Sequence, residues 1–350
     1  MSIRTIAHGL ATLGDVDEPK EVTRRVPGPE RTQQQHCCCY SWGMRSVIIN
    51  RPGDPSVLEV VELPKPKPGP NQLVIRTAAA TVNPTDLLLR QQGAGEVPPP
   101  WIPGMEVAGT VETAGEGVDF QPGERVFAMV NARSPQGGGQ SEFVLVSAAS
   151  VVRTPDGVSD VEAATIPMNG LTALQALRRL DLPRGATLGV IGSAGVVGQY
   201  AVQLGVHAGL RVVADAKPGD EELVRGFGAH EVIARSDNPG AAFRAVVPDG
   251  VDGLIDAAAI DGAALAPIRD HGALATVRFW TGPTERGIRI EPVMVLHDIE
   301  RTESLQKLAD LLRAGRLTTR IAATYPIDRI QEAHIRLAAG GVRGRLVLVF

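Results

Sequence analysis

Residues 186–216 restrict the fold of this chain more than any other stretch, because they combine a buried strand, a glycine turn and a helix. The run Ala186–Ile191 carries too few polar residues for a half-exposed strand and is typical of the centre of a parallel sheet. The glycines of the turn Gly192–Gly198 allow backbone N–H groups to approach a diphosphate. The helix that continues to Gly209 directs its positive N-terminal end at the same anion. This order predicts a dinucleotide-binding βαβ unit.

The strand Arg211–Ala216 comes next and places Asp215 about twenty residues after Gly195. This is the separation expected for an acid that binds the adenosine ribose. Ser193 stands where the usual G-x-G-x-x-G pattern begins with glycine, so a purely structural βαβ turn is the alternative interpretation. The predicted cofactor-binding residues of the turn are Ser193, Ala194, Gly195, Val196, Val197 and Gly198.

The length and composition of the chain exclude several other classes of protein. A chain of 350 residues has room for two domains, and 43% apolar with 21% charged residues is an ordinary globular composition. The net charge of −4 provides no basic excess for a nucleic acid, and no apolar run approaches the roughly 20 residues that span a bilayer. We therefore expect a small-molecule substrate, no nucleic acid and no membrane partner.

Residues 1–43 lack strand or helix periodicity and are expected to form a disordered extension ahead of Met44. They have no apolar core of the signal-peptide type, so we expect no targeting role. All three cysteines, Cys37–Cys39, stand in this extension, and consecutive thiols cannot readily converge on one metal ion. We expect reduced thiols, a cytoplasmic location and no thiolate zinc site in the folded part of the chain.

Short strands separated by proline and glycine predict a β-barrel-like domain between Met44 and about Val152. The expected strands are Val47–Ile49, Val57–Leu63, Gln72–Arg76, Glu106–Val111 and Ser141–Val146. A short helix is expected at Asp86–Arg90 and an extended surface loop at Glu96–Pro103.

Helices and strands alternate after Ser159, which predicts right-handed crossovers and a doubly wound sheet. The expected helices are residues 160–166, 171–180, 221–227, 240–247 and 303–314, and the further strands are residues 231–234, 251–257 and 273–277. A closing strand, residues 345–350, is expected to return to the first domain. The predicted domains are residues 44–168 together with 317–350, and residues 169–316.

Several motifs occur in a characteristic order: Val82–Asp86, Pro103–Gly109, Gly123–Phe127, Ala163–Pro167, Leu171–Ala173, the glycine turn, Gly228–Ile233 and Gly341–Leu348. Together they resemble the medium-chain dehydrogenase/reductase superfamily, specifically its zinc-independent, quinone-oxidoreductase-like branch. The resemblance covers about residues 44–350. It implies an α/β fold, with a GroES-like β-barrel domain, a Rossmann domain with a doubly wound parallel sheet, a nicotinamide cofactor between them, and a homodimer.

The resemblance also implies catalysis without zinc. Zinc-dependent relatives carry a cysteine and a histidine ligand where this chain has Asn83 and Met105, and the four-cysteine structural zinc loop is absent. The seven histidines show no ligand spacing. We therefore expect no metal at the site.

Without zinc, the expected reaction is hydride delivery from NAD(P)H to a quinone or another activated, electron-poor acceptor. An alkenal/enone or enoyl-thioester reductase is the alternative within enzymes. A structural or sensor protein that binds NADP(H) with little turnover is the alternative from another class.

The predicted catalytic residues are Asn83 and Thr172. Their family positions place Asn83 near the substrate carbonyl or the nicotinamide ribose, and Thr172 beside the nicotinamide ring. Asn169 is implied as a cofactor contact. The alternatives are that Asn83 only begins a turn and that Asn169 and Thr172 only cap a helix. Leu88 stands where related quinone reductases often have a tyrosine, which removes the obvious general acid.

Further site residues follow from the same resemblance. Arg345 is implied as a cofactor-phosphate ligand, and a solvated arginine is the alternative. Trp101, Phe279 and Trp280 are predicted to wall the substrate pocket. Phe279 and Trp280 are alternatively core or dimer-contact aromatics.

The choice of coenzyme depends on the adenosine ribose. Asp215 favours the free hydroxyl of NAD(H) and would repel a 2′-phosphate. The cationic residues Lys217 and Arg235 favour NADP(H) instead, and Arg235 corresponds to a position that approaches the ribose in NADPH-using relatives. A lysine that is frequent in those relatives is replaced by Asp220. Resemblance to this branch favours NADP(H) over NAD(H).

Overall fold

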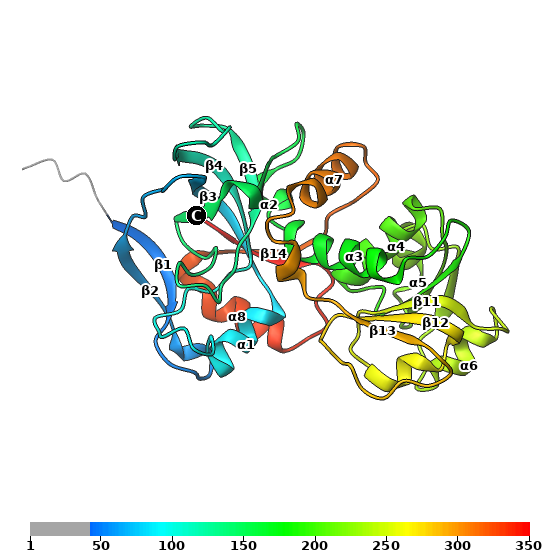
Figure 1. The fold of residues 1–350 in the computed structure, drawn as a ribbon. Helices are drawn as coiled ribbons and strands as arrows, with labels where there is room; N and C mark the ends of the chain where they lie inside the picture. The colour runs from blue at the N-terminus through cyan, green and yellow to red at the C-terminus, as the bar shows by residue number, and fades with distance from the viewer. Residues whose placement is uncertain (1–42) are drawn as a thin grey trace, which may run out of the picture. The chain divides into compact units, whose positions relative to one another are not determined.

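The computed structural model of the chain describes residues 43–350, which belong to one unit. The predictions for residues 1–42, including the three cysteines, lie outside the described part. The fold class is confirmed: a β domain of the GroES-like type is joined to a Rossmann domain built on a parallel sheet (Figure 1).

The Rossmann sheet has six parallel strands in the order β10-β9-β8-β11-β12-β13. Their bounds are β8 Thr187–Ile191, β9 Arg211–Ala216, β10 Glu231–Ala234, β11 Val251–Asp256, β12 Ile268–Thr276 and β13 Arg289–Pro292. Leu188 and Val190 of β8 are fully buried, as expected for a central strand. Because the strand order reverses between β8 and β11, their carboxyl ends form the crevice where such sheets bind ligands.

The helices of this domain follow the alternation that the sequence predicts. Their bounds are α3 Pro167–Leu180, α4 Val196–His207, α5 Glu221–Gly226, α6 Pro239–Arg244 and α7 Thr302–Arg313. The connection from β8 to α4 is the glycine turn, so the turn lies at the reversal of strand order.

The β domain holds a seven-stranded sheet in the order β14-β15-β3-β4-β5-β7, with β6 also paired to β3. The bounds are β3 Gln72–Val82, β4 Glu106–Ala114, β5 Arg125–Met129, β6 Phe143–Ser147, β7 Val151–Arg153, β14 Ile321–Pro326 and β15 Arg345–Val349. The strands β1 Gly43–Ile49 and β2 Leu58–Pro64 form a separate antiparallel pair. The helices are α1 Pro84–Gln92, α2 Asp160–Ala163 and α8 Ile330–Ala338.

Strand β15 returns to the first domain, as the sequence predicts, and pairs antiparallel with β3 from Leu346 opposite Val82 to Val349 opposite Ala79 (Figure 1). Strands β5, β7, β13 and β14 and helix α8 were not predicted from the sequence. Strand β14 shows the reason, since all six of its residues are exposed or half-buried and none is buried.

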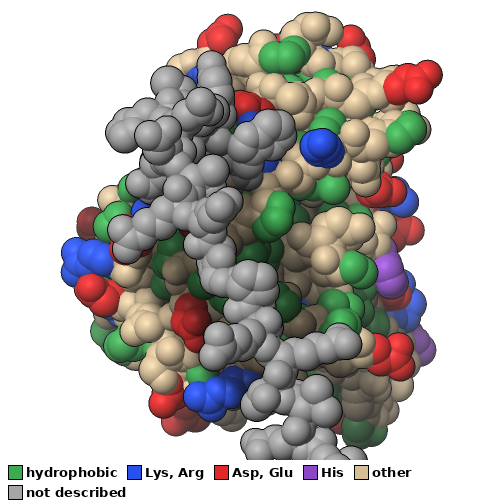
Figure 2. All heavy atoms as spheres, turned by 90° about the vertical axis from the view of Figure 1, so that its left-hand side faces the viewer, with side chains coloured by type: hydrophobic (Ala, Val, Ile, Leu, Met, Phe, Trp, Pro, Cys, Tyr) green, Lys and Arg blue, Asp and Glu red, His purple; other side chains and the backbone are tan. Residues whose placement is uncertain are grey.

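Acidic and basic side chains are interspersed over the described part of the face in Figure 2, with hydrophobic side chains scattered between them. Within residues 43–350, no helix is both long enough and apolar enough to pass through a bilayer. The cytoplasmic location stays a prediction.

Candidate active site

The glycine turn needs glycine where strand and helix approach most closely. Gly192 has a φ of 84°, a conformation that side chains disfavour. A Cβ at Gly198 would lie 2.3 Å from the carbonyl oxygen of Gly192, so α4 can start this close to β8 only without a side chain there. The N–H groups of its first turn have no acceptors within the helix. They therefore offer an anion site at the end of the sheet.

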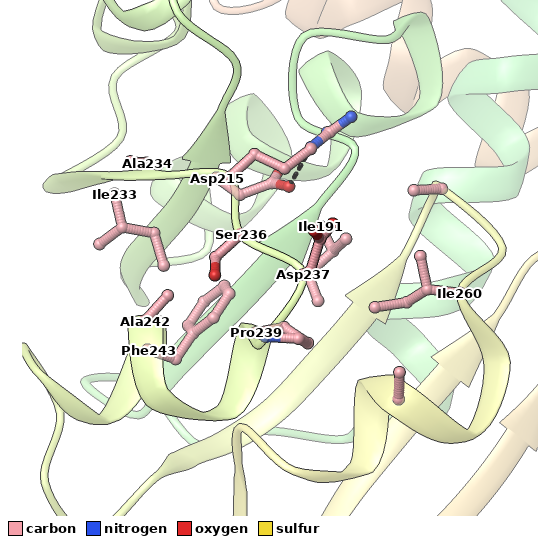
Figure 3. Close-up of a pocket in the computed structure, with 13 residues that line it drawn as sticks. Ile191, Asp215, Ile233, Ala234, Ser236, Asp237, Pro239, Ala242, Phe243 and Ile260 are labelled. Atoms are coloured by element: carbon pink, nitrogen blue, oxygen red, sulfur yellow. Dashed lines mark hydrogen bonds and ion pairs between the residues drawn. The ribbon is translucent and has the colours of Figure 1, made fainter.

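Asp215 supports the turn from the neighbouring strand. It is buried, and its Oδ1 accepts hydrogen bonds from the N–H groups of Gly192 at 2.7 Å and Ser193 at 3.3 Å. Arg235 donates to both carboxylate oxygens, from Nε at 2.6 Å and from Nη2 at 3.1 Å (Figure 3). Both oxygens of the acid that the sequence assigns to the ribose thus already have partners in the protein.

A cavity of about 260 Å³ opens beside this ion pair, between the ends of the strands and α6 (Figure 3). Its apolar walls are Ile191, Ile233, Phe243 and Ile260. Asp215 and Arg235 stand at its polar side, together with Ser236 and Asp237. An apolar slot with a few polar groups at one side has the chemistry that a planar adenine and its ribose require.

Arg320, which the sequence analysis did not single out, lies against the same turn from the loop before β14. Its Nη2 donates to the carbonyl oxygen of Ala194 at 2.9 Å, and its Nε donates to Oε1 of Gln199 at 2.6 Å. The guanidinium lies 5.0 Å from the centre of the Phe227 ring. Its Nη1 is buried and has no hydrogen-bond partner among the described residues. A buried N–H without an acceptor, at a helix N-terminus, fits a bound anion.

No sequence signal identifies Arg320, because 126 residues separate it from Ala194 and no motif contains it. Burial lowers the pKa of this guanidinium from its ordinary value. Arginine nevertheless stays protonated in proteins, so the charge at the turn is permanent.

Glu106 joins the polar residues of the β domain to α3. It is fully buried, and its Oε1 accepts hydrogen bonds from Thr81, Arg345 and, at 3.3 Å, from Nδ2 of Asn83. Its Oε2 accepts from the N–H of Met168 at 2.8 Å. The predicted residue Asn83, Arg345 and the first turn of α3 therefore meet at one carboxylate. The sequence analysis included Glu106 in a motif but assigned it no role.

Asn83 begins α1 and is fully buried. Its N–H donates to the carboxylate of Asp86 at 2.7 Å, which fixes Asn83 at the start of the helix. Burial raises the pKa of Asp86 to about 7. The Oδ1 of Asn83 has no hydrogen-bond partner among the described residues. This oxygen is therefore left to accept a hydrogen bond from a bound molecule.

The other predicted polar residues lie near this junction or near the turn. Thr172 is buried, and its Oγ1 donates to the carbonyl oxygen of Met168 at 2.7 Å within α3. Asn169 is buried one turn earlier, and its Nδ2 has no partner among the described residues. Arg345 is 5% exposed and is not a solvated side chain. Lys217 is exposed just after β9.

The three predicted aromatic residues have different surroundings. Trp101 lies in the main hydrophobic core, where its Nε1 donates to the carbonyl oxygen of Val97 at 2.7 Å. Phe279 is 50% exposed in the loop after β12. Trp280 is partly buried against a second cluster of the Rossmann domain.

Residues 43–350 contain no group of three or more His, Cys, Asp or Glu side chains that could hold a metal ion. Met105, at the position of the histidine ligand in zinc-dependent relatives, is buried.

The chain is similar to known protein families and to solved structures. Residues 69–156 match the family described as the alcohol dehydrogenase GroES-like domain, and residues 227–348 match the family described as zinc-binding dehydrogenase. A chloroplast envelope quinone oxidoreductase homolog of Arabidopsis thaliana is 29% identical over 317 residues, which cover 85% of this chain and 95% of the relative. A trans-enoyl reductase of Aspergillus terreus is 32% identical over 235 residues, which cover 62% and 73% of the two chains.

Among solved structures, mycobacterial Rv1454c complexed with NADPH is similar with a TM-score of 0.77 and 26% identity, covering 87% of this chain and 100% of that chain. The chain belongs to the medium-chain dehydrogenase/reductase superfamily, in its quinone-oxidoreductase-like branch. It is an NAD(P)H-dependent oxidoreductase that acts on a small molecule.

Proposed function

We propose that this enzyme transfers hydride from NADPH to a quinone, without a catalytic zinc ion. The observation that carries the proposal is Asn83, which stands where zinc-dependent relatives have a cysteine ligand. It is fully buried, and its Nδ2 donates to Glu106 and Thr81. A neutral amide in this position does not replace a thiolate as a zinc ligand. An acceptor that needs no Lewis acid, such as a quinone, suits such a site.

In this proposal, the protein's own groups bind the coenzyme and orient it toward the substrate. The first N–H groups of α4 and the Nη1 of Arg320 are suited to hold the diphosphate of the coenzyme. Asn169 and Thr172 of α3 are the proposed contacts of the nicotinamide, which supplies the hydride when NADPH is bound. Because the free atom of Asn83 is an oxygen, we assign it to accept a hydrogen bond from a hydroxyl, either of the nicotinamide ribose or of the reduced product.

The preference for NADP(H) over NAD(H) is supported by the Asp215–Arg235 pair. Oδ1 of Asp215 is occupied by the glycine turn and by Arg235, and Oδ2 accepts a hydrogen bond from Arg235, so little of the carboxylate's acceptor capacity is left for a ribose hydroxyl. Arg235 also neutralises the charge that would repel a 2′-phosphate.

The similarity to the quinone oxidoreductase homolog from Arabidopsis thaliana supports a quinone as the substrate. The similarity to the trans-enoyl reductase favours an activated alkene as the second candidate substrate. Stopped-flow mixing of the NADPH-loaded enzyme with a small quinone and with a panel of enones and enoyl thioesters separates the two. Rapid oxidation of NADPH by the quinone alone is the expected result. Tight binding without oxidation by any acceptor would instead indicate a binding protein with little turnover.

We also propose a homodimer formed through sheet edges. In the described part of the chain, β13 lies at one edge of the Rossmann sheet and β10 at the other. The chain has a mass of 36.9 kDa, and light scattering coupled to size-exclusion chromatography is expected to give twice this value. A monomer mass at micromolar concentration would contradict it.

A further inference from the structure

Three arginines from distant segments bind groups that lie at or follow the carboxyl ends of β8 and β9 or contact the glycine turn. Arg235 follows β10 and pairs with Asp215, whereas Arg320 precedes β14 and contacts the glycine turn. Arg343 precedes β15 and binds Asp220, which lies just before α5. The sequence analysis gave Arg343 no role.

The Arg343–Asp220 pair is bidentate. Arg343 donates from Nε at 2.8 Å and from Nη2 at 2.7 Å to the two carboxylate oxygens. This hydrogen bond lowers the pKa of Asp220, and the charges of Arg343, Arg235 and Arg320 lower it further, against the opposing effect of burial.

The three arginines stand beside the carboxylates of Asp215 and Asp220, and Asp237 adds a third carboxylate at the polar side of the cavity. The Nη1 of Arg320 is buried without a partner among the described residues. A diphosphate bound at the turn supplies the acceptor that Arg320 lacks. Arg343 and Arg235 keep their carboxylate partners, Asp220 and Asp215, which a more highly charged phosphate could displace.

Arg343 has room to change partner. Its side chain is 40% exposed, whereas that of Asp220 is 14% exposed. A Cβ added at Gly340 or Gly341 would meet no atom within 4 Å, so the segment before Arg343 is open. Arginine binds a phosphate through the same two-pronged geometry that it uses on a carboxylate.

We propose that Arg343 is the residue that selects a 2′-phosphorylated coenzyme: its guanidinium leaves Asp220 and takes the adenosine 2′-phosphate, beside Arg235. Asp220 is then a built-in competitor for this phosphate. This inference rests on the proposed NADP(H) site and adds to it the residue that sets the preference.

The test measures binding of coenzyme fragments by calorimetry, with 2′,5′-ADP and 5′-AMP as probes, followed by NADPH and NADH. For Arg343→Ala we expect 2′,5′-ADP and NADPH to bind about 10- to 100-fold more weakly, while 5′-AMP and NADH change less than about twofold. For Asp220→Asn we expect tighter binding of 2′,5′-ADP, because the competing charge is gone. Arg343→Lys keeps the charge but loses the bidentate geometry of the guanidinium. Its affinity for 2′,5′-ADP and NADPH should lie between those of Arg343→Ala and the wild type.

Arg313→Ala is the matched control, since Arg313 forms an exposed ion pair with Asp310 on α7, and it should leave all four affinities unchanged. The inference would be overturned if Arg343→Ala weakened the binding of phosphorylated and unphosphorylated probes equally, or weakened neither. The proposed function would still stand in that case, provided that the wild type binds NADPH. A wild-type enzyme that binds neither dinucleotide would overturn the proposed function itself.

Discussion

At the scale of single residues, His334 has an unusual environment for an ionisable side chain. It is fully buried in α8, and neither ring nitrogen has a hydrogen-bond partner among the described residues. Burial, and then the charge of Arg90, lower the pKa of His334 to about 3. The histidine is therefore neutral in the folded enzyme across the physiological range.

This pKa makes stability depend on pH in a definite direction. The unfolded histidine, with a pKa near 6.5, binds a proton below that pH and the folded one does not, so stability is full above about pH 6.5 and is lost as the pH falls toward 3. At pH 5, His334 alone should lower the free energy of unfolding by about 2 kcal/mol relative to neutral pH. In urea unfolding, the free energy of unfolding is expected to change less between pH 7 and pH 5 for His334→Leu than for the wild type. His207→Ala, at an exposed position, is the control, and equal differences for His334→Leu and the wild type would contradict the assignment.

The free oxygen of Asn83 gives a second prediction at this scale. Asn83→Ala removes the only side-chain acceptor that we assign to the bound hydroxyl, so kcat/KM for the quinone is expected to fall by about 10-fold or more. Asn131→Ala changes a surface-turn asparagine that accepts a hydrogen bond from the N–H of Arg133, and it should leave turnover unchanged. Steady-state kinetics provide the measurement. Unaltered turnover in Asn83→Ala would reduce this residue to its helix-start role.

At the scale of elements, the glycine turn sets how closely α4 approaches β8. Gly198→Ala would place a Cβ 2.3 Å from the Gly192 carbonyl oxygen and 2.5 Å from Cα of Ser193, so backbone atoms must move. We expect NADPH affinity to fall at least about 10-fold and the melting temperature to drop.

Gly226→Ala is the control for this substitution. It lies at the end of α5, where an added Cβ meets nothing within 4 Å, and it should raise stability by about 0.5–1 kcal/mol. Fluorescence titration with NADPH and thermal unfolding measure both effects. Full affinity in Gly198→Ala would show that the turn tolerates a wider separation.

The elements also show how far the sequence could predict the molecule. The glycine turn and the alternation after Ser159 were predictable because each rests on local periodicity and turn chemistry. Strand β14 was not, since its mostly exposed residues form a strand only by pairing with β15. The partners of Arg320 and Asp215 were equally hidden, because they depend on residues 126 and about 20 positions away whose approach is set by the tertiary fold.

At the scale of the whole molecule, Glu106 connects the two domains through buried contacts. It pairs with Arg345 of β15 and accepts the N–H of Met168 at the start of α3. Glu106→Gln would leave the buried guanidinium of Arg345 without its counter-ion, which is expected to cost about 3–5 kcal/mol of unfolding free energy.

A double-mutant cycle tests this contribution. Adding Arg345→Met to Glu106→Gln removes the unpaired charge and should recover part of the loss, as judged by denaturant unfolding of all four proteins. Strictly additive effects would mean that the two side chains do not stabilise one another.

The pairing of β15 with β3 has a consequence for how the protein is made. Thr81 and Arg345, which meet through a hydrogen bond, are 264 residues apart in the chain. At ribosomal speed the edge of β3 waits roughly 10–50 s for its partner, and its N–H and C=O groups are open to wrong neighbours throughout that time. The nascent β domain is therefore the stage at which chaperone protection should matter most, while the Rossmann sheet, whose strands are contiguous in the chain, can close first.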